Sequence, residues 1–142
     1  MELKINHRGI NIEYVENIEQ LKNCTTYLQT LNIIAFDLEF DKNSYLYGFN
    51  LCLIQIASEK RCFVIDPLKF SNKQLKAVYD VFENPTILKI LHSGGEDLRL
   101  LQTLGCKLQN LFDTDIAVKL LNYEKISLGN VIKAKFDITL DK

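Results

Sequence analysis

Residues 33–40 read IIAFDLEF, an apolar run that carries two acids one residue apart. The apolar residues predict a buried β-strand near the middle of a sheet. An ionised carboxylate that is buried without water or a partner costs several kcal/mol of stability. The run therefore has two interpretations. Either the strand ends early and leaves Asp37 and Glu39 solvated at its rim, or it carries the two acids for a chemical purpose.

The composition is that of one globular domain covering residues 1–142. Of these residues 47% are hydrophobic and 25% are charged, which suits a single hydrophobic core. The net charge of −1 gives no bulk attraction to nucleic acid or anionic membrane. An enzyme that binds phosphates through bound cations needs no such excess of basic residues. No run is long enough to span a membrane, so no membrane partner is expected.

The four cysteines favour a cytoplasmic protein. They form no CxxC pair, and at least three of them fall in apolar strand or helix patterns. This distribution is typical of reduced, buried thiols rather than of a zinc site or a disulfide framework.

Hydrophobic periodicity predicts alternating strands and helices. Residues 10–15 alternate like a short edge strand, and 17–31 follow with helical spacing. After the acid-bearing strand, two β-rich runs joined by Glu59 and Lys60 predict an antiparallel hairpin. The remaining expected elements are a helix at 72–84, a strand at 86–93, a helix closed by Gly105, a short strand at 110–114, and helices at 116–123 and 126–136.

This order predicts an α/β fold. The antiparallel three-strand meander and two further parallel strands give a mixed five-stranded sheet. Crossover connections to parallel strands place helices on both faces of such a sheet.

Three acids are expected to meet at one edge of this sheet. Side chains alternate along a strand, so Asp37 and Glu39 share a face, with Cβ atoms roughly 7 Å apart. Asp97 lies in the first turn of the helix that follows the strand at 86–93. If that strand is parallel to 33–40, both end at the same edge. The alternative for Asp97 is a helix cap, since acids are favoured near helix N-termini.

Three converging carboxylates repel one another unless a cation neutralises them. Oxygen ligands without His or Cys favour Mg²⁺ or Mn²⁺. Two such ions about 3.5–4 Å apart would stabilise the attacking and leaving oxygens of a phosphodiester. Asp37, Glu39 and Asp97 are therefore the candidate metal ligands and catalytic residues.

Several blocks together resemble a known family. FDLEF, LCLIQIAS with CFVIDPL, KILHSGGEDLRLL, LFDTDIAVKLLNY and SLGNVIKAKFDITLDK are similar, in this order from about residue 30 onward, to the ribonuclease D-like 3′–5′ exonucleases of the DEDD superfamily. The resemblance implies a ribonuclease H-like fold and removal of nucleotides from 3′ ends with two divalent metal ions. It implies that Asp37 and Glu39 form the first motif and Asp97 the second, and that Leu38 and Phe40 contact the substrate terminus.

His92 and Asp97 also spell HxxxxD, the third motif of a sister branch of the superfamily. Their place directly after the first three strands favours the second motif instead. His92 is then a packing or hydrogen-bonding residue at the strand end, with a role in substrate binding as a further candidate. Asp66 and Asp113 are interpreted as structural residues, at a strand-end turn and a helix cap.

The resemblance also implies a last motif, Tyr-x-x-x-Asp, on a downstream helix. None of the six tyrosines is followed by Asp four residues later. We therefore expect three of the four acidic ligands, and a domain that lacks its C-terminal helices.

Two classes of function remain. The first is a 3′–5′ exonuclease for single-stranded nucleic acid, with RNA favoured over DNA. The alternative is a catalytically weak or inert module for nucleic-acid binding or assembly. A homo-oligomer or a partner chain would then cover the place of the missing helices.

Overall fold

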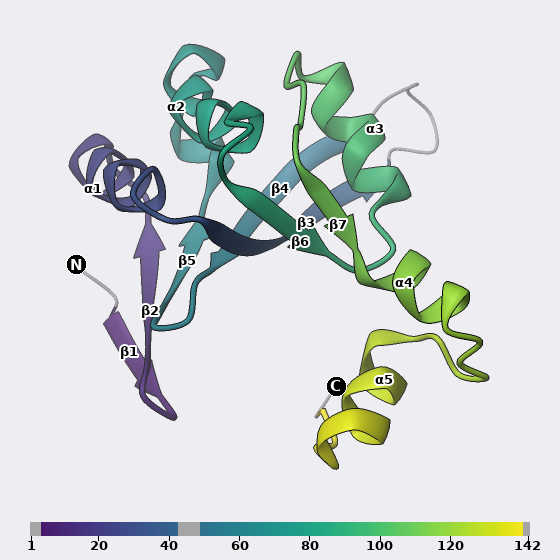
Figure 1. The fold of residues 1–142 in the computed structure, drawn as a ribbon. Helices are drawn as coiled ribbons and strands as arrows, with labels where there is room; N and C mark the ends of the chain where they lie inside the picture. The colour runs from purple at the N-terminus through teal and green to yellow at the C-terminus, as the bar shows by residue number, and fades with distance from the viewer. Residues whose placement is uncertain (1–3, 43–48, 141–142) are drawn as a thin grey trace.

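The computed structural model describes residues 4–42 and 49–140. The strands in these residues form one mixed sheet (Figure 1). Within this part of the chain the sheet has seven strands. Their spatial order is β1 (Lys4–His7), β2 (Ile10–Val15), β5 (Arg61–Ile65), β4 (Phe49–Ala57), β3 (Ile33–Lys42), β6 (Leu88–Leu91) and β7 (Leu111–Asp113).

The predicted five-stranded unit forms the greater part of the sheet. β3, β4 and β5 are an antiparallel meander, and β6 and β7 continue it in parallel on the β3 side. The α/β class and this arrangement are confirmed. The predicted edge position of 10–15 is wrong, because β2 pairs in parallel with β5 and β1 lies outside it.

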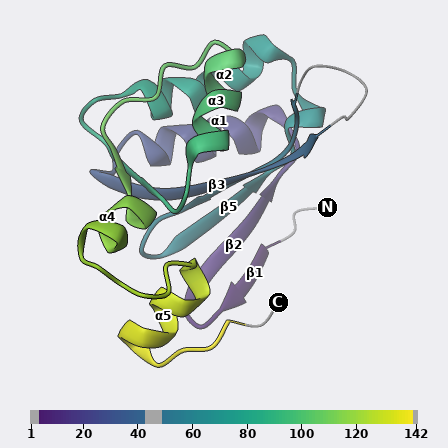
Figure 2. The same cartoon turned by 90° about the vertical axis from the view of Figure 1, so that its right-hand side faces the viewer.

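Helices lie on both sides of the sheet, as predicted, but only one face is closed by them (Figure 2). One face carries α1 (Ile18–Leu28), α2 (Asn72–Glu83) and α3 (Gly95–Thr103). The other carries α4 (Thr114–Leu120) and α5 (Leu128–Phe136), and a short 3₁₀ turn, η1 (Pro67–Lys69), follows β5. Gly105 follows the C-cap of α3 with φ of +84°, the left-handed conformation expected of a glycine that ends a helix.

The core lies between the sheet and α1–α3. Along β3 the side chains of Ile34, Phe36 and Leu38 are buried, and the Phe36 ring packs on the fully buried Phe82 of α2 at 4.7 Å. The alternate residues of β3 are exposed. They lie on the sheet face away from α1–α3, which we call the open face: Ile33, Ala35, Asp37, Glu39 and Asp41.

This alternation corrects the argument from burial cost. Asp37 and Glu39 are exposed on the open face, so solvent alone makes them tolerable in an otherwise apolar strand. Of the three candidate acids, the buried one is Asp97, at 9% exposure. The cost of placing a carboxylate away from water therefore falls on α3 rather than on β3.

Two irregularities mark the C-terminal half of β3. β6 pairs with β3 only from Ile33 to Ala35, and beyond this point no strand pairs with that side of β3 within the described residues. On the other side, the register with β4 shifts between Glu39 and Phe40, which leaves Cys52 of β4 as the extra residue of a bulge. Bulges are frequent next to active sites, where they redirect side chains.

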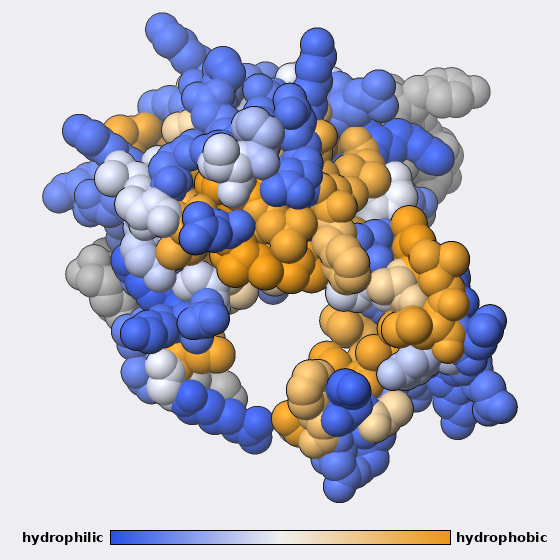
Figure 3. Space-filling model, viewed as in Figure 1, coloured by the Kyte–Doolittle hydropathy of each residue, from blue (hydrophilic) through white to orange (hydrophobic). Residues whose placement is uncertain are grey.

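The last two helices pack loosely. α5 has no buried residue, and large apolar side chains of α4 and α5 are exposed. Figure 3 shows apolar surface over these helices and over the middle of the molecule, with an open gap between them. The exposed residues at or around the two helices are Phe112, Ile116, Leu120, Leu121, Leu128, Phe136, Ile138 and Leu140.

The prediction of at least three buried cysteines is only partly met. All four thiols are free; Cys24 and Cys106 are buried, whereas Cys62 is half-buried and Cys52 is exposed on its bulge. No helix within residues 4–42 and 49–140 is long and apolar enough to cross a membrane.

Candidate active site

Asp97 reaches the edge of β3 where β6 has left it. The Leu38 N–H donates a hydrogen bond of 3.2 Å to Oδ1 of Asp97. Because β6 pairs no further than Ala35, this N–H lacks a strand partner on that side. The Asp97 carboxylate takes the place of the missing backbone acceptor. Because Leu38 lies between Asp37 and Glu39 in β3, this bond places the Asp97 carboxylate next to both.

Asp97 lies close enough to Asp37 for their charges to interact. Burial raises the pKa of Asp97 above its ordinary value, and the Asp37 charge raises the pKa further. The N–H groups of Asp97 itself and of Leu38 oppose this effect only in part. The structure thus brings Asp37 and Asp97 together, and Glu39 lies two residues further along the same face.

The donor chemistry of these three acids fits a hard divalent cation. All are carboxylates, and among the described residues no basic side chain forms an ion pair with any of them. In residues 4–42 and 49–140, however, no three His, Cys, Asp or Glu side chains lie close enough to form a metal site. Asp41, which the sequence analysis did not consider, is a third acid in the exposed row on β3, after Asp37 and Glu39.

The predicted substrate-contacting residues of β3 face inward. The Leu38 side chain is buried and its N–H is bound to Asp97. Phe40 is half-buried and packs against the core. Their roles in substrate binding stay predictions.

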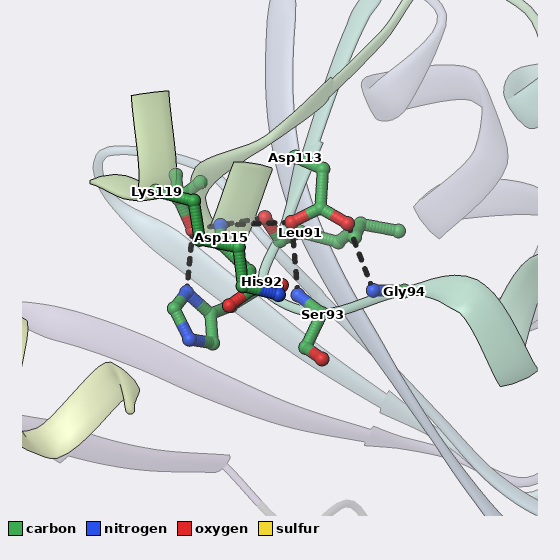
Figure 4. Close-up of polar contacts among 8 residues, drawn as sticks. Leu91, His92, Ser93, Gly94, Asp113, Asp115 and Lys119 are labelled. Carbon is green, nitrogen blue, oxygen red and sulfur yellow. Dashed lines mark hydrogen bonds and ion pairs between the residues drawn. The ribbon is translucent and has the colours of Figure 1, made fainter. Parts of the chain in front are cut away.

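His92 is held in one orientation at the end of β6 (Figure 4). Its Nδ1 lies 2.9 Å from the Thr114 hydroxyl, and this hydroxyl donates its only proton to the Leu91 carbonyl at 3.0 Å. Nδ1 must therefore be the donor, which leaves the lone pair on Nε2 when the ring is neutral. His92 directly follows the last residue of β6, and its ring lies against Thr114 of α4.

Asp113 contacts the turn between β6 and α3. Its side chain caps α4 by accepting from the Asp115 N–H at 2.8 Å, as predicted. It also accepts from the N–H groups of Ser93 at 2.9 Å and Gly94 at 3.0 Å (Figure 4). The sequence analysis missed these two bonds, because their donors lie about twenty residues earlier in the chain and no local motif marks them.

Comparisons with known proteins identify the family of the chain. Residues 12–142 match the family model described as 3′-5′ exonuclease. Over 129 residues the chain is 35% identical to the exosome complex component 10 homolog of Caenorhabditis elegans, covering 90% of this chain and 14% of that protein. Over 112 residues it is 38% identical to ribonuclease D of Sphingobium indicum, covering 77% of this chain and 28% of that enzyme.

A solved structure extends the match to three dimensions. The catalytic core of RRP6 from Trypanosoma brucei superposes with a TM-score of 0.86 at 30% identity, covering 97% of this chain and 38% of that one. The chain therefore spans less than a third of the length of these curated relatives and under half of the solved core. It belongs to the 3′–5′ exonuclease domain family, in its ribonuclease D-like branch.

Proposed function

We propose that the chain is a 3′–5′ exoribonuclease that hydrolyses the terminal phosphodiester of single-stranded RNA. The observation that carries this proposal is the Asp97 carboxylate bound to Leu38 N–H between two exposed acids. The relatives named ribonuclease D and RRP6 support RNA over DNA as the substrate.

Asp37, Glu39 and Asp97 are the residues that would hold the metal ions, which we propose to be two Mg²⁺ or Mn²⁺. Bound ions would make hydroxide available near neutral pH and neutralise charge at the scissile phosphate. The protein prepares this chemistry by fixing Asp97 on the Leu38 N–H. The printed sequence holds three of the four acids that the family resemblance implies.

His92 is proposed to contact the substrate rather than act as a base. Thr114 engages Nδ1, and among the described residues Nε2 has no hydrogen-bond partner. A neutral Nε2 accepts a hydrogen bond, and a ribose hydroxyl of the terminal nucleotide is a donor of the right kind. His92→Gln should therefore raise KM for RNA more than it lowers kcat.

The test is degradation of RNA that carries a 5′ label. With Mg²⁺ or Mn²⁺ present, a ladder that shortens from the 3′ end is expected, and the same oligonucleotide in DNA should be degraded more slowly. Asp37→Asn and Glu39→Gln, prepared in the same way, control for contaminating nucleases. A wild-type chain that leaves no ladder at any metal concentration would reject the activity.

A second candidate, an assembly role, is favoured by the exposed apolar residues of α4 and α5. Such a surface is unusual on a monomer and suits a second copy or a partner chain. Sedimentation of the wild type against Leu120→Glu with Leu121→Glu tests this role. A wild type that stays monomeric at high concentration, with no shift in the variant, rejects self-association.

The cytoplasmic location stays a proposal. It rests on the four free thiols, which suit a reducing compartment.

A further inference from the structure

The turn from β6 into α3 is held in an unfavourable backbone conformation. Ser93 has φ of +61°, in the left-handed region that costs a residue with a Cβ atom on the order of 1 kcal/mol. At Gly94 a Cβ would lie 2.2 to 2.9 Å from three side-chain atoms of Leu91. Something outside the turn must compensate for this conformation.

Asp113 supplies that compensation. Oδ1 accepts from the Ser93 N–H and Oδ2 from the Gly94 N–H, so both carboxylate oxygens are engaged by consecutive backbone donors of the turn. Burial raises the pKa of Asp113, but the N–H groups of Gly94, Ser93, Asp115 and Ile116 together lower it below the ordinary value. The carboxylate that holds the turn is therefore ionised at neutral pH.

The same turn positions Asp97. Residues 93–97 are bound at one end by Asp113 and at the other by the contact of Asp97 with Leu38. α3 starts at Gly95, so Asp97 is only two residues inside the helix. A change in the turn must change the direction in which α3 leaves the sheet, and with it the place of the Asp97 carboxylate.

We infer that Asp113 is a positioning residue for Asp97: its carboxylate fixes the Ser93–Gly94 turn and thereby aims the α3 acid at β3. This inference rests on the proposed nuclease function for its consequence in catalysis, but its structural part does not. A cap of α4 needs only the Asp115 N–H. The two additional bonds to Ser93 and Gly94 serve the turn.

Asp113→Ser separates the two roles. Serine caps helices about as well as aspartate, but its single short hydroxyl cannot accept from both Ser93 and Gly94. Exchange of the Leu38 amide proton, measured by NMR without metal, should become about tenfold faster, because its acceptor on Asp97 is displaced. The kcat for RNA should fall about tenfold or more with KM little changed, as for other residues that orient a metal ligand.

Asp66→Asn is the matched control. Asp66 also caps a turn at a strand end, through the Leu68 N–H, and binds the Tyr14 hydroxyl, but it follows β5, two strands away from β3. The Asp66→Asn substitution should lower the denaturant midpoint of unfolding without changing exchange of the Leu38 amide proton or kcat. If Asp113→Ser behaves like this control, the inference is overturned.

A second variant keeps the test valid if Asp113→Ser folds poorly. In Asp113→Asn the amide N–H₂ cannot accept, so one of the bonds from Ser93 and Gly94 is lost. Adding Ser93→Gly to this variant removes the cost of the positive φ at residue 93. If Asp113 acts through the turn, Ser93→Gly should restore protection of Leu38 in the Asn variant and change little in the wild type. Equal effects in both backgrounds reject the inference. An inactive wild type with slow Leu38 exchange would reject the nuclease function alone.

Discussion

The two faces of the sheet have different roles: one forms the hydrophobic core, and the other carries the candidate catalytic acids. The face under α1–α3 is closed by side chains such as Phe36 and Phe82, which are almost entirely buried. On the open face the same strand, β3, presents Asp37 and Glu39 to solvent. Because the division runs between alternate residues of one strand, a change at one residue should affect folding while a change at its neighbour affects function.

The largest expected effect is on the closed face. Phe82→Ala removes a fully buried ring that packs on Phe36, so the free energy of unfolding should fall by about 3–5 kcal/mol. Urea denaturation measures this loss. Ile116→Ala on exposed α4 is the control and should stay within about 0.5 kcal/mol of the wild type. A loss below 1 kcal/mol for Phe82→Ala would contradict the proposed location of the core.

The next effect is on the open face and concerns activity. Asp37→Asn keeps the side-chain shape but removes the charge, so RNA degradation should slow by roughly 10²–10³-fold, or about 3–4 kcal/mol of barrier. Since Asp37 is exposed, the free energy of unfolding should change little. Single-turnover kinetics and urea denaturation on the same preparation compare the two quantities. A large loss of stability would show that the two faces are not independent.

A smaller effect on stability is expected at Gly94, in the turn between β6 and α3. Gly94→Ala places a Cβ against the buried Leu91, which must shift, at a cost of about 1–3 kcal/mol. Gly95→Ala is the adjacent control, because a Cβ built there meets no atom within 4 Å other than its chain neighbours and its own helix backbone. Thermal unfolding should separate the two variants, and equal midpoints would mean that Leu91 moves freely.

The smallest effect is on pH dependence. Because the pKa of Asp97 is raised by folding, its protonated form favours the folded state. That stabilisation is complete below the ordinary value of 3.8 and is lost as pH rises through the folded pKa. Asp97→Asn has no such group, so in EDTA the variant should gain stability relative to the wild type over that range. If the free energies of unfolding of the two proteins change with pH in the same way, the raised pKa of Asp97 is contradicted.

The sequence predicted most of the fold because its signals are local. Alternation on β3, the short hairpin connection at Glu59–Lys60 and the α3 end at Gly105 each lie within a few residues of what they specify. β1 was missed because its four residues carry no clear alternation. The parallel pairing of β2 with β5 joins segments about fifty residues apart, so no local pattern predicts it.

The sequence predicted where the three candidate acids lie on the sheet and on α3, but not their contacts. The spacing of Asp37 and Glu39 gave their shared face, and the helix start gave the place of Asp97. The bond from Leu38 to Asp97 depends on the point at which β6 leaves β3, which no residue pattern marks. For the same reason Asp113 could be interpreted only as a cap.

The bulge opposite Glu39 has a practical consequence for labelling. Burial raises the pKa of the Cys24 and Cys106 thiols to about 12, and that of the half-buried Cys62 is also raised. Cys52 is exposed on the bulge, one strand away from the acids. Maleimide dyes or spin labels should therefore attach first at Cys52, which gives the unmutated protein a reporter beside its candidate catalytic residues.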